Sequence, residues 1–510
     1  MSDFGEWLPS ITAEPPGPRS LALADRLAAV ETRNVTWLGD DFPVFWTEAS
    51  GANIRDADDN VYIDLTAAFG VALWGHRNPW IGGAIQAQAE RLVHGMGDVH
   101  PPRGKLQLLE SLARLMPWAD TRTTLANSGS EAVEIALKTA RLKTGKSGVI
   151  AFEGGYHGLT AGALAATERP YFREPFQSTL NPGVAWLPYP HQHGDAGVEP
   201  VDEMAVLDEV RRLLREGVRS RANDHIPVGA IILEAVQARG GVRVLSESFG
   251  RALTALANEA GVVLIADEIF TGVGRCGALL ASSRVGLTPD VVCVGKVLGG
   301  GLPLSACCGS AEVMNAWPES PGEALHTSTF LGHPLACSAG TAVLAEVDAG
   351  LPERAEALGE KLRAMLGAAL GREPGVSPVR GLGLLLGFTM IDGAGAAIPG
   401  AGFDVAKAAL RRGLILLPAG DRGEVVELSP PVVLKDAQIE FAVDALVASV
   451  REVVGGAARE MAGGLAQEAM VGSIAASDSD LDPGVEDVSP APSIDAGADV
   501  GTSEVVGGQG

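Results

Sequence analysis

Six short apolar segments, separated by segments with helical spacing, constrain the fold of this chain more than any other feature. They are TTLAN, GVIAFEG, VAWLPYP, VGAIILEAV, VVLIADEIF and DVVCVGKVL, and they lie between residues 123 and 298. Their length suits β-strands, and runs this apolar suit strands that are buried on both faces. The alternation predicts an α/β fold whose mostly parallel sheet is flanked by helices in a large domain.

Two of these strands lead directly to a charged residue. Val262 to Ala266 precedes Asp267, and Val291 to Val294 precedes Lys296. Because ligands bind at the carboxyl ends of the strands in open α/β sheets, we expect both charges to face one cavity. Pyridoxal phosphate needs such a pair, the amine for a Schiff base and the carboxylate as partner of the pyridine nitrogen.

The alternative is that both charges are merely solvent-facing loop residues. The segment GKVLGGGLPLSA, which contains Lys296, argues against it, because consecutive glycines let the backbone approach a flat ligand closely.

A second motif, NSGSEA, follows the strand TTLA and opens a helix. Ser128 with Glu131 three residues later matches a capping box, which needs no ligand. The same geometry also suits a phosphate, because free N–H groups at Gly129 and Ser130 lie at the positive end of a helix. Both interpretations stay open at this point.

The third motif is GGYHG, directly after the strand GVIAF. Tyr156 between glycines can stack on a planar ring, or it can be a core residue with a satisfied hydroxyl. A fourth candidate, Gly145-Lys146-Ser147, resembles the end of a nucleotide-binding P-loop. That interpretation fails, because the segment precedes a strand instead of opening a helix.

Composition excludes several classes of partner. The formal net charge is -24, which argues against nucleic acid and against an anionic membrane surface. We find no signal peptide and no apolar run long enough to span a membrane. The five cysteines show neither disulfide-framework nor zinc-ligand spacing, so we predict no metal site and a cytoplasmic location.

Changes in pattern suggest four segments. Residues 1–74 form an N-terminal arm and a hairpin segment around the turn Asp58-Asp59-Asn60, and residues 75–335 form the large ligand-binding domain. Residues 336–455 form a smaller α+β domain. Residues 456–510 are poor in apolar residues, and we predict a disordered acidic tail.

The ordered motifs NSGSEA, YHG, EAVQARGG, ADEIFTGVGRCG, VGKVLGGGLPLSA and HTSTFLGHPLACSAG resemble those of the class III aminotransferases. This group includes the ornithine, acetylornithine and 4-aminobutyrate aminotransferases. The resemblance covers about residues 20 to 450. It implies a fold type I enzyme dependent on pyridoxal 5'-phosphate, active as a homodimer with shared sites.

The resemblance also implies roles for individual residues. Lys296 corresponds to the Schiff-base lysine and Asp267 to the partner of the pyridine nitrogen. Thr329 corresponds to a threonine that reaches the phosphate bound by the neighbouring subunit. By the same likeness, Ser128, Gly129 and Ser130 correspond to part of the phosphate site, Tyr156 to the ring that stacks on the cofactor, and His157 to a further cofactor-binding residue.

Several positions depart from the family pattern. Phe270 stands where a Gln is frequent, and His333 stands where an Asn is frequent. Arg239 stands where the ornithine and 4-aminobutyrate enzymes have Glu, and Glu427 stands where they have a carboxylate-binding Arg.

This reversal of charge suggests a substrate site of a different kind. We expect Arg239 and Glu427 to form a swapped ion pair, from which Arg239 can take a substrate carboxylate. Arg422 is a second candidate for that carboxylate, and Trp74 is a candidate for a wall of the substrate pocket.

The sequence therefore predicts an aminotransferase that moves an amino group from an amino acid or ω-amine to a 2-oxo acid in two half-reactions. A racemase, epimerase or aminomutase on the same scaffold is the alternative, because it needs the same Lys296.

Overall fold

The computed structural model describes residues 4–39, 41–192 and 201–477, with side chains described up to residue 456. The chain divides into two compact units, Met1–Gly455 and Gly456–Gly510. Helix α14 (Asp436–Ser477) continues past residue 456, where the sequence analysis places the start of the tail. Residues 478–510 lie outside the described residues, so disorder in that segment stays a prediction.

The other α-helices are α1 (Pro18–Ala28), α2 (Ala67–Gly70), α3 (Pro79–Ala89), α4 (Arg103–Leu115), α5 (Gly129–Thr144), α6 (Ala161–Ala166), α7 (Pro170–Arg173), α8 (Glu203–Glu216), α9 (Glu247–Ala260), α10 (Ala311–Met314), α11 (Pro334–Asp348), α12 (Leu351–Leu370) and α13 (Ala401–Leu410). Short 3₁₀ helices are η1 (Phe4–Glu6), η2 (Glu174–Thr179), η3 (Ala281–Val285) and η4 (Lys296–Gly299).

The strands are β1 (Trp46–Ser50), β2 (Asn53–Asp56), β3 (Val61–Asp64), β4 (Thr121–Ala126), β5 (Gly148–Phe152), β6 (Val184–Leu187), β7 (Val218–Arg219), β8 (His225–Ile226), β9 (Val228–Leu233), β10 (Val236–Gln237), β11 (Arg243–Val244), β12 (Val263–Glu268), β13 (Val291–Val294), β14 (Ser305–Ser310), β15 (Arg380–Leu382), β16 (Leu385–Thr389), β17 (Leu414–Ile415), β18 (Leu417–Ala419) and β19 (Val425–Leu428).

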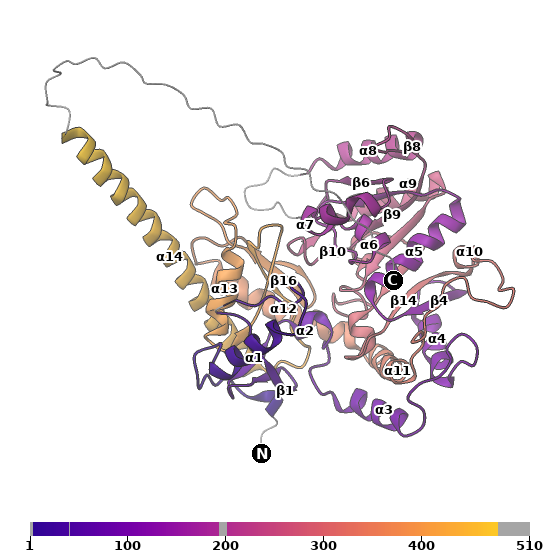
Figure 1. Ribbon diagram of the computed structural model, residues 1–510, viewed down its shortest axis with the longest axis horizontal. Coiled ribbons are helices and arrows are strands. Elements are labelled where there is room, and N and C mark those ends of the chain that lie inside the picture. The colour runs from indigo at the N-terminus through magenta and orange to yellow at the C-terminus, as the bar shows by residue number, and fades with distance from the viewer. Residues whose placement is uncertain (1–3, 40, 193–200, 478–510) are drawn as a thin grey trace, which may run out of the picture. The chain divides into compact units, whose positions relative to one another are not determined.

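The first unit is built around a seven-stranded sheet of order β4-β14-β13-β12-β9-β5-β6 (Figure 1). All six strands predicted from the sequence are present in it. Strands β13, β12, β9, β5 and β6 pair in parallel. Strand β14 runs antiparallel to both of its neighbours. The prediction of an α/β fold with a mostly parallel sheet is therefore confirmed.

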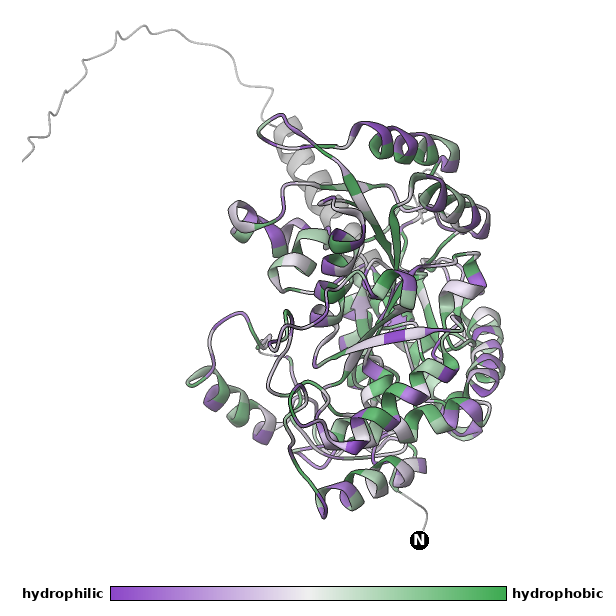
Figure 2. Ribbon diagram, turned by 90° about the vertical axis from the view of Figure 1, so that its right-hand side faces the viewer, coloured by the Kyte–Doolittle hydropathy of each residue, from purple (hydrophilic) through white to green (hydrophobic). Residues whose placement is uncertain are grey.

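Helices cover both faces of this sheet. Alternate residues of β5 and β12, such as Val149 and Ile265, pack with α5 and α6. The residues between them, such as Ile150 and Leu264, pack with α8 and α9 on the opposite face. Figure 2 shows the hydrophobic colour concentrated along the strands, whereas the covering helices carry both colours. Burial on both faces explains why these strands show no polar alternation.

The predicted hairpin is present as β2 and β3, which pair antiparallel across the turn. Strand β17, far along the chain, pairs in parallel with β3. The antiparallel sheet β15-β16-β19-β18 lies against the same core as α12, α13 and the first part of α14. Residues 1–455 cluster as one compact unit, so the predicted boundaries at residues 74 and 335 stay predictions.

Helix α2 is a left-handed turn between β3 and the rest of the chain. The φ angles of Ala67, Ala68 and Phe69 are 45°, 49° and 59°, and that of Gly70 is 80°. Non-glycine residues occupy this region only when neighbouring contacts hold them there. Buried Asp64 supplies such contacts, because its carboxylate accepts hydrogen bonds from the N–H of Ala68 at 3.0 Å and from the N–H and hydroxyl of Thr66.

Arg275 joins this turn to distant segments. Its fully buried guanidinium donates to the carbonyl oxygens of Gly70 at 3.1 Å, Leu384 at 3.3 Å, Ser429 at 2.9 Å and Pro430 at 2.6 Å. Burial lowers the pKa of Arg275 to about 10, so the group stays charged at neutral pH. The α2 turn and the strands β16 and β19 are thereby held around the end of β12.

Within the described residues, no helix has both the length and the apolar character that crossing a membrane requires.

Candidate active site

A cavity of about 710 Å³ opens where β12 and β13 end and where α5 begins. The structure brings eight of the predicted site residues to its wall, namely Ser128, Gly129, Ser130, Tyr156, His157, Arg239, Asp267 and Lys296. Asp267 and Lys296 thus face one cavity, as the strand ends predicted. Three other predicted site residues, Trp74, Thr329 and Glu427, are not part of the wall.

Asp267 is held in place by His157. The two side chains are joined by a hydrogen bond of 2.8 Å between Nδ1 of His157 and Oδ2 of Asp267, and both are buried. Burial alone would lower the pKa of His157, but the hydrogen bond and the charge of Asp267 raise it above its ordinary value. A protonated imidazole donates a charge-assisted hydrogen bond that orients the carboxylate. The other oxygen, Oδ1, accepts from the N–H of Ile269 at 3.1 Å.

Lys296 lies two residues beyond β13, in the first position of η4, with a φ of 44°. Burial lowers the pKa of its amine to about 8, although the negative charges of Asp267, Glu427 and Glu234 oppose this shift. A substantial fraction of the amine is therefore neutral near physiological pH, and a neutral amine is the form that acts as nucleophile or base.

The beginning of α5 forms an anion site. The backbone N–H groups of Gly129 and Ser130 line the cavity, and in the described part of the chain they donate to no other group. A Cβ at Gly129 would lie 2.9 Å from the side chain of Ile269, so glycine is needed there. The positive end of this 16-residue helix adds to the attraction for an anion.

The structure also confirms the capping box predicted for NSGSEA. The hydroxyl of Ser128 accepts from the N–H of Glu131 at 3.2 Å. The carboxylate of Glu131 accepts from the N–H of Asn127 at 2.7 Å. Ser130 instead accepts from two N–H groups of the segment that follows GGYHG. The capping contacts fix the start of the helix and leave the first two N–H groups pointing to the cavity.

Tyr156 and Arg239 meet at the cavity wall. The guanidinium carbon of Arg239 lies 5.2 Å from the centroid of the Tyr156 ring. Burial raises the pKa of the Tyr156 hydroxyl, although Arg239 opposes the shift. The Tyr156 ring therefore presents a neutral aromatic surface to the cavity, and exposed Arg239 presents a positive charge.

The predicted ion pair between Arg239 and Glu427 is wrong. Glu427, on β19, is only 3% exposed, and Ser429 donates to its carboxylate at 3.4 Å. Burial raises the pKa of Glu427, whereas the positive charges of Lys296 and Arg239 lower it. The two groups interact at a distance without forming a contact, because Glu427 points into the interior and Arg239 lies over Tyr156.

Two other predicted residues lie away from the cavity. Trp74 is buried in the core with the guanidinium of Arg354 at 5.0 Å from its ring, so it does not wall the pocket as predicted. Trp74 comes after the left-handed turn of α2, and the sequence did not reveal the conformation of that turn. Thr329 is exposed and outside the wall, and its predicted contact with a partner's phosphate stays a prediction.

Glu234 belongs to the site, although the sequence analysis did not select it. Its carboxylate accepts from the N–H of Tyr156 at 3.0 Å, and burial raises its pKa to about 7. The signal that could have found it is the one used for Asp267, because Glu234 directly follows the buried strand β9.

Comparisons with known proteins agree with this geometry. The family profile for aminotransferase class-III matches residues 37–450. An acetylornithine aminotransferase of Methanopyrus kandleri is 37% identical over 80% of this chain and 95% of its own length. A 5-aminovalerate aminotransferase of Pseudomonas aeruginosa is 35% identical over 82% of this chain and 95% of its own length.

Solved structures give the same result. An (S)-enantioselective omega-transaminase from Thermomicrobium roseum superposes with a TM-score of 0.76 and 26% identity over 85% of this chain and 99% of its own. The ornithine aminotransferase of Toxoplasma gondii superposes with a TM-score of 0.71 and 28% identity over 85% of this chain and 95% of its own.

The raised pKa of Glu234 predicts a pH-dependent cost to stability. An unfolded glutamate titrates near 4.3, whereas this buried group titrates near 7. The protonated carboxyl therefore contributes fully to the unfolding free energy below the unfolded value, and this contribution is lost as the pH rises through the folded value. Glu234→Gln removes the titration and keeps a hydrogen-bond acceptor. We expect the unfolding free energy of the variant, relative to the parent, to rise by roughly 3 kcal/mol between about pH 4.5 and 7.

Urea unfolding at a series of pH values measures this difference. Glu259→Gln, at an exposed position of α9, serves as the matched control and should show no such trend. A difference between Glu234→Gln and the parent that stays constant with pH would contradict the prediction.

Proposed function

The chain belongs to the class III aminotransferases, and from this premise we propose that its cavity binds pyridoxal 5'-phosphate with Lys296 and Asp267 at the reacting centre. Members of the family move an amino group from an amino donor to a 2-oxo acid. The single observation that carries the assignment of residues is the convergence of an amine, a paired carboxylate and an anion site on one cavity. No observation favours a racemase, epimerase or aminomutase.

The described residues fit this cofactor. The free N–H groups of Gly129 and Ser130 suit its phosphate, with Ser128 and Ser130 framing that site. Asp267 keeps lone pairs for the pyridine nitrogen beyond those used by His157 and Ile269. Tyr156 offers a neutral aromatic face to the ring. The cavity of about 710 Å³ leaves room for a substrate as well.

The roles of the residues follow from their chemistry. When bound, pyridoxal phosphate draws electrons from the substrate carbon that carries the amine, which makes the C–H bond there acidic. Asp267, oriented by His157, holds a proton on the pyridine nitrogen. Lys296, with a pKa near 8, would accept the proton that leaves that carbon and would be the group that returns it.

The direct test replaces Lys296. An amino donor added alone should reduce the visible absorbance of the purified parent and yield one equivalent of its deaminated carbonyl product, which is an aldehyde for a terminal amine and a 2-oxo acid for a 2-amino acid. Lys296→Ala should lower turnover roughly 10²–10⁴-fold, since a positioned acid or base contributes about that much. Absorption spectroscopy and an assay of the carbonyl product measure both effects.

Lys361→Ala, at an exposed position of α12, is the control and should behave as the parent. If a chiral donor loses its chirality and no carbonyl product forms, the protein is a racemase and the proposal fails.

We further propose that the donor carries a carboxylate distant from its amine, and that Arg239 binds this carboxylate. Apart from Lys296 and His157, which pairs with Asp267, Arg239 is the basic residue of the cavity wall, and it is exposed there without an ion pair among the described residues. A guanidinium donates hydrogen bonds to both oxygens of a carboxylate at once. The relatives named for acetylornithine, 5-aminovalerate and 4-aminobutyrate support donors of this class.

Arg239→Gln should therefore change the KM of one of two matched donors and not that of the other. We expect the KM for 5-aminovalerate to rise roughly 10–100-fold, because a hydrogen-bonded charge pair contributes about 1.5–3 kcal/mol. The KM for pentylamine, which has the same chain without the carboxylate, should not change. Steady-state kinetics with both donors test this expectation.

Arg422→Gln is the comparison variant, because exposed Arg422 was a second candidate but does not line the cavity. Equal losses for 5-aminovalerate and pentylamine in Arg239→Gln would show that Arg239 does not bind the carboxylate.

A second copy of the chain is proposed to complete the site. Leu92, Val93, Met96 and Val99, between α3 and α4, are between 43% and 60% exposed. This apolar segment contacts the segment that contains Thr329. The hydroxyl of Thr327 donates to Asp98 at 3.0 Å, and the ring of His94 lies against that of Phe330. Contiguous exposed apolar side chains mark association surfaces. The homodimer implied by the family would cover them and bring Thr329 to the partner's cofactor.

Val93→Asp is expected to halve the mass in solution, because a buried unpaired charge opposes association. Thr329→Ala should leave the dimer intact and weaken cofactor binding roughly tenfold, the effect of one lost hydrogen bond. Light scattering and cofactor titration measure these outcomes, with Val30→Asp as an exposed control. A monomeric parent would refute the shared site.

A cytoplasmic location completes the proposal. All five cysteines are buried free thiols, which a reducing compartment preserves.

A further inference from the structure

The amine of Lys296 has one specific neighbour. Its Nζ lies 3.8 Å from the centroid of the Phe270 ring. Among the described residues, no hydrogen bond or ion pair of this amine accompanies that contact. Phe270 stands where the family often has Gln, so the reactive amine of this protein faces an aromatic ring at that side.

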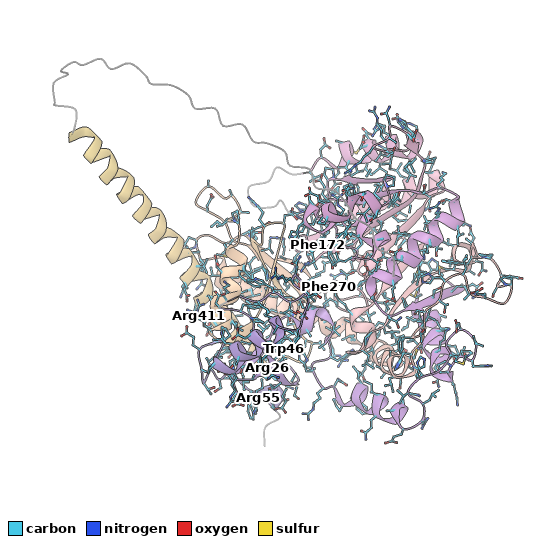
Figure 3. The ribbon with its side chains drawn as sticks, in the orientation of Figure 1. Arg26, Trp46, Arg55, Phe172, Phe270 and Arg411 are labelled. Carbon is cyan, nitrogen blue, oxygen red and sulfur yellow. The ribbon has the colours of Figure 1, made fainter. Side chains whose placement is uncertain are left out.

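The Phe270 ring is itself fixed in place. It is 8% exposed, lines the cavity and stands two residues beyond the end of β12. Its place in the chain is labelled in Figure 3. A Cβ at Gly70 would lie 2.9 Å from this ring, so the ring occupies space that only a glycine leaves open. The carbonyl of Gly70 is held by buried Arg275. The left-handed turn of α2 and the Arg275 contacts therefore form a rigid support behind the ring.

The charged groups around the amine determine what the ring contributes. Asp267, Glu427 and Glu234 favour the protonated amine, whereas burial and the positive charge of Arg239 oppose it. An aromatic face attracts an ammonium through its negative quadrupole, but it cannot accept the proton. Phe270 thus holds the charged amine without competing for the proton that Lys296 must transfer.

We propose that Phe270 is a positioning residue for Lys296. The face of the Phe270 ring binds the ammonium of Lys296 whenever that amine is not bonded to the cofactor. This inference rests on the proposed role of Lys296. A Gln at this position would offer a hydrogen bond to the cofactor. Phe270 gives up that hydrogen bond and instead positions the free amine of Lys296.

The experiment measures the free amine in the loaded protein. Pyridoxamine phosphate carries an amine instead of an aldehyde, so it occupies the site without bonding to Lys296. The chain has eight lysines, so lysine labelled with ¹³C at Cε gives few signals, and Lys296→Ala identifies the one of interest. Its titration by NMR gives the pKa of the amine, which should lie near 8 in the parent.

Two replacements of Phe270 isolate the ring. Phe270→Leu removes the aromatic face, and pentafluorophenylalanine at the same position keeps the shape of the ring while reversing its quadrupole. Both should lower the pKa of Lys296 by about one unit, the effect of losing one desolvated cation–π contact. Phe176→Leu, at an exposed position outside the cavity, should leave it unchanged.

Parent-like titration in both Phe270 replacements would overturn the inference while leaving the proposed function intact. A shift in the leucine variant alone would also overturn it, because packing and not the ring face would then be responsible. Failure of the parent to bind pyridoxamine phosphate would instead refute the proposed cofactor site, and the inference with it.

Discussion

Burial of several charges around one cavity is the constraint on which the rest of this structure depends. Asp267, Glu234 and Glu427 are all less than 9% exposed, and the amine of Lys296 lies in their field. Isolated buried charges are costly, so each must be matched by hydrogen bonds or by an opposite charge. His157 matches Asp267 in this way, and the backbone of Tyr156 matches Glu234. The resulting balance places the pKa of Lys296 near 8, in the range that proton transfer at neutral pH requires.

The scaffold around the cavity is adapted to this balance. The seven-stranded sheet delivers Asp267 and Lys296 from neighbouring parallel strands, and α5 delivers two free N–H groups. Arg275 then joins the end of β12 to segments more than 100 residues away in the sequence, through carbonyl oxygens alone. This buried cation, whose terminal nitrogens donate to neutral carbonyl oxygens, adds positive potential near Glu427. The strained α2 turn is held in the same network, which leaves space for Phe270 beside the amine.

The departures from the family pattern now have distinct physical meanings. Arg239 brings a positive charge to the exposed wall of the cavity, whereas Glu427 is buried and places a negative charge in the interior. A simple exchange of ion-pair partners would have kept both groups in contact. Instead, the charge of Arg239 faces the cavity, and the charge of Glu427 raises the proton affinity of Lys296. The ring face of Phe270 contacts the amine of the same lysine.

The resemblance to the class III aminotransferases selected His157 and Arg239. The sequence by itself determined the six strands, the strand ends that carry Asp267 and Lys296, and the loops that carry Ser128 and Tyr156. These features depend on local periodicity and on strand ends, which neighbouring residues encode directly. Only the tertiary structure decided the separation of Arg239 from Glu427, the burial of Trp74, the inclusion of Glu234 and the contact of Phe270 with Lys296. Each of these depends on where a side chain points after segments distant in sequence have packed, and on a left-handed turn that no local pattern revealed. Lys296 and Asp267, the proposed reacting centre, could therefore be found from the sequence, whereas the surroundings that set the proton affinity of Lys296 required the fold.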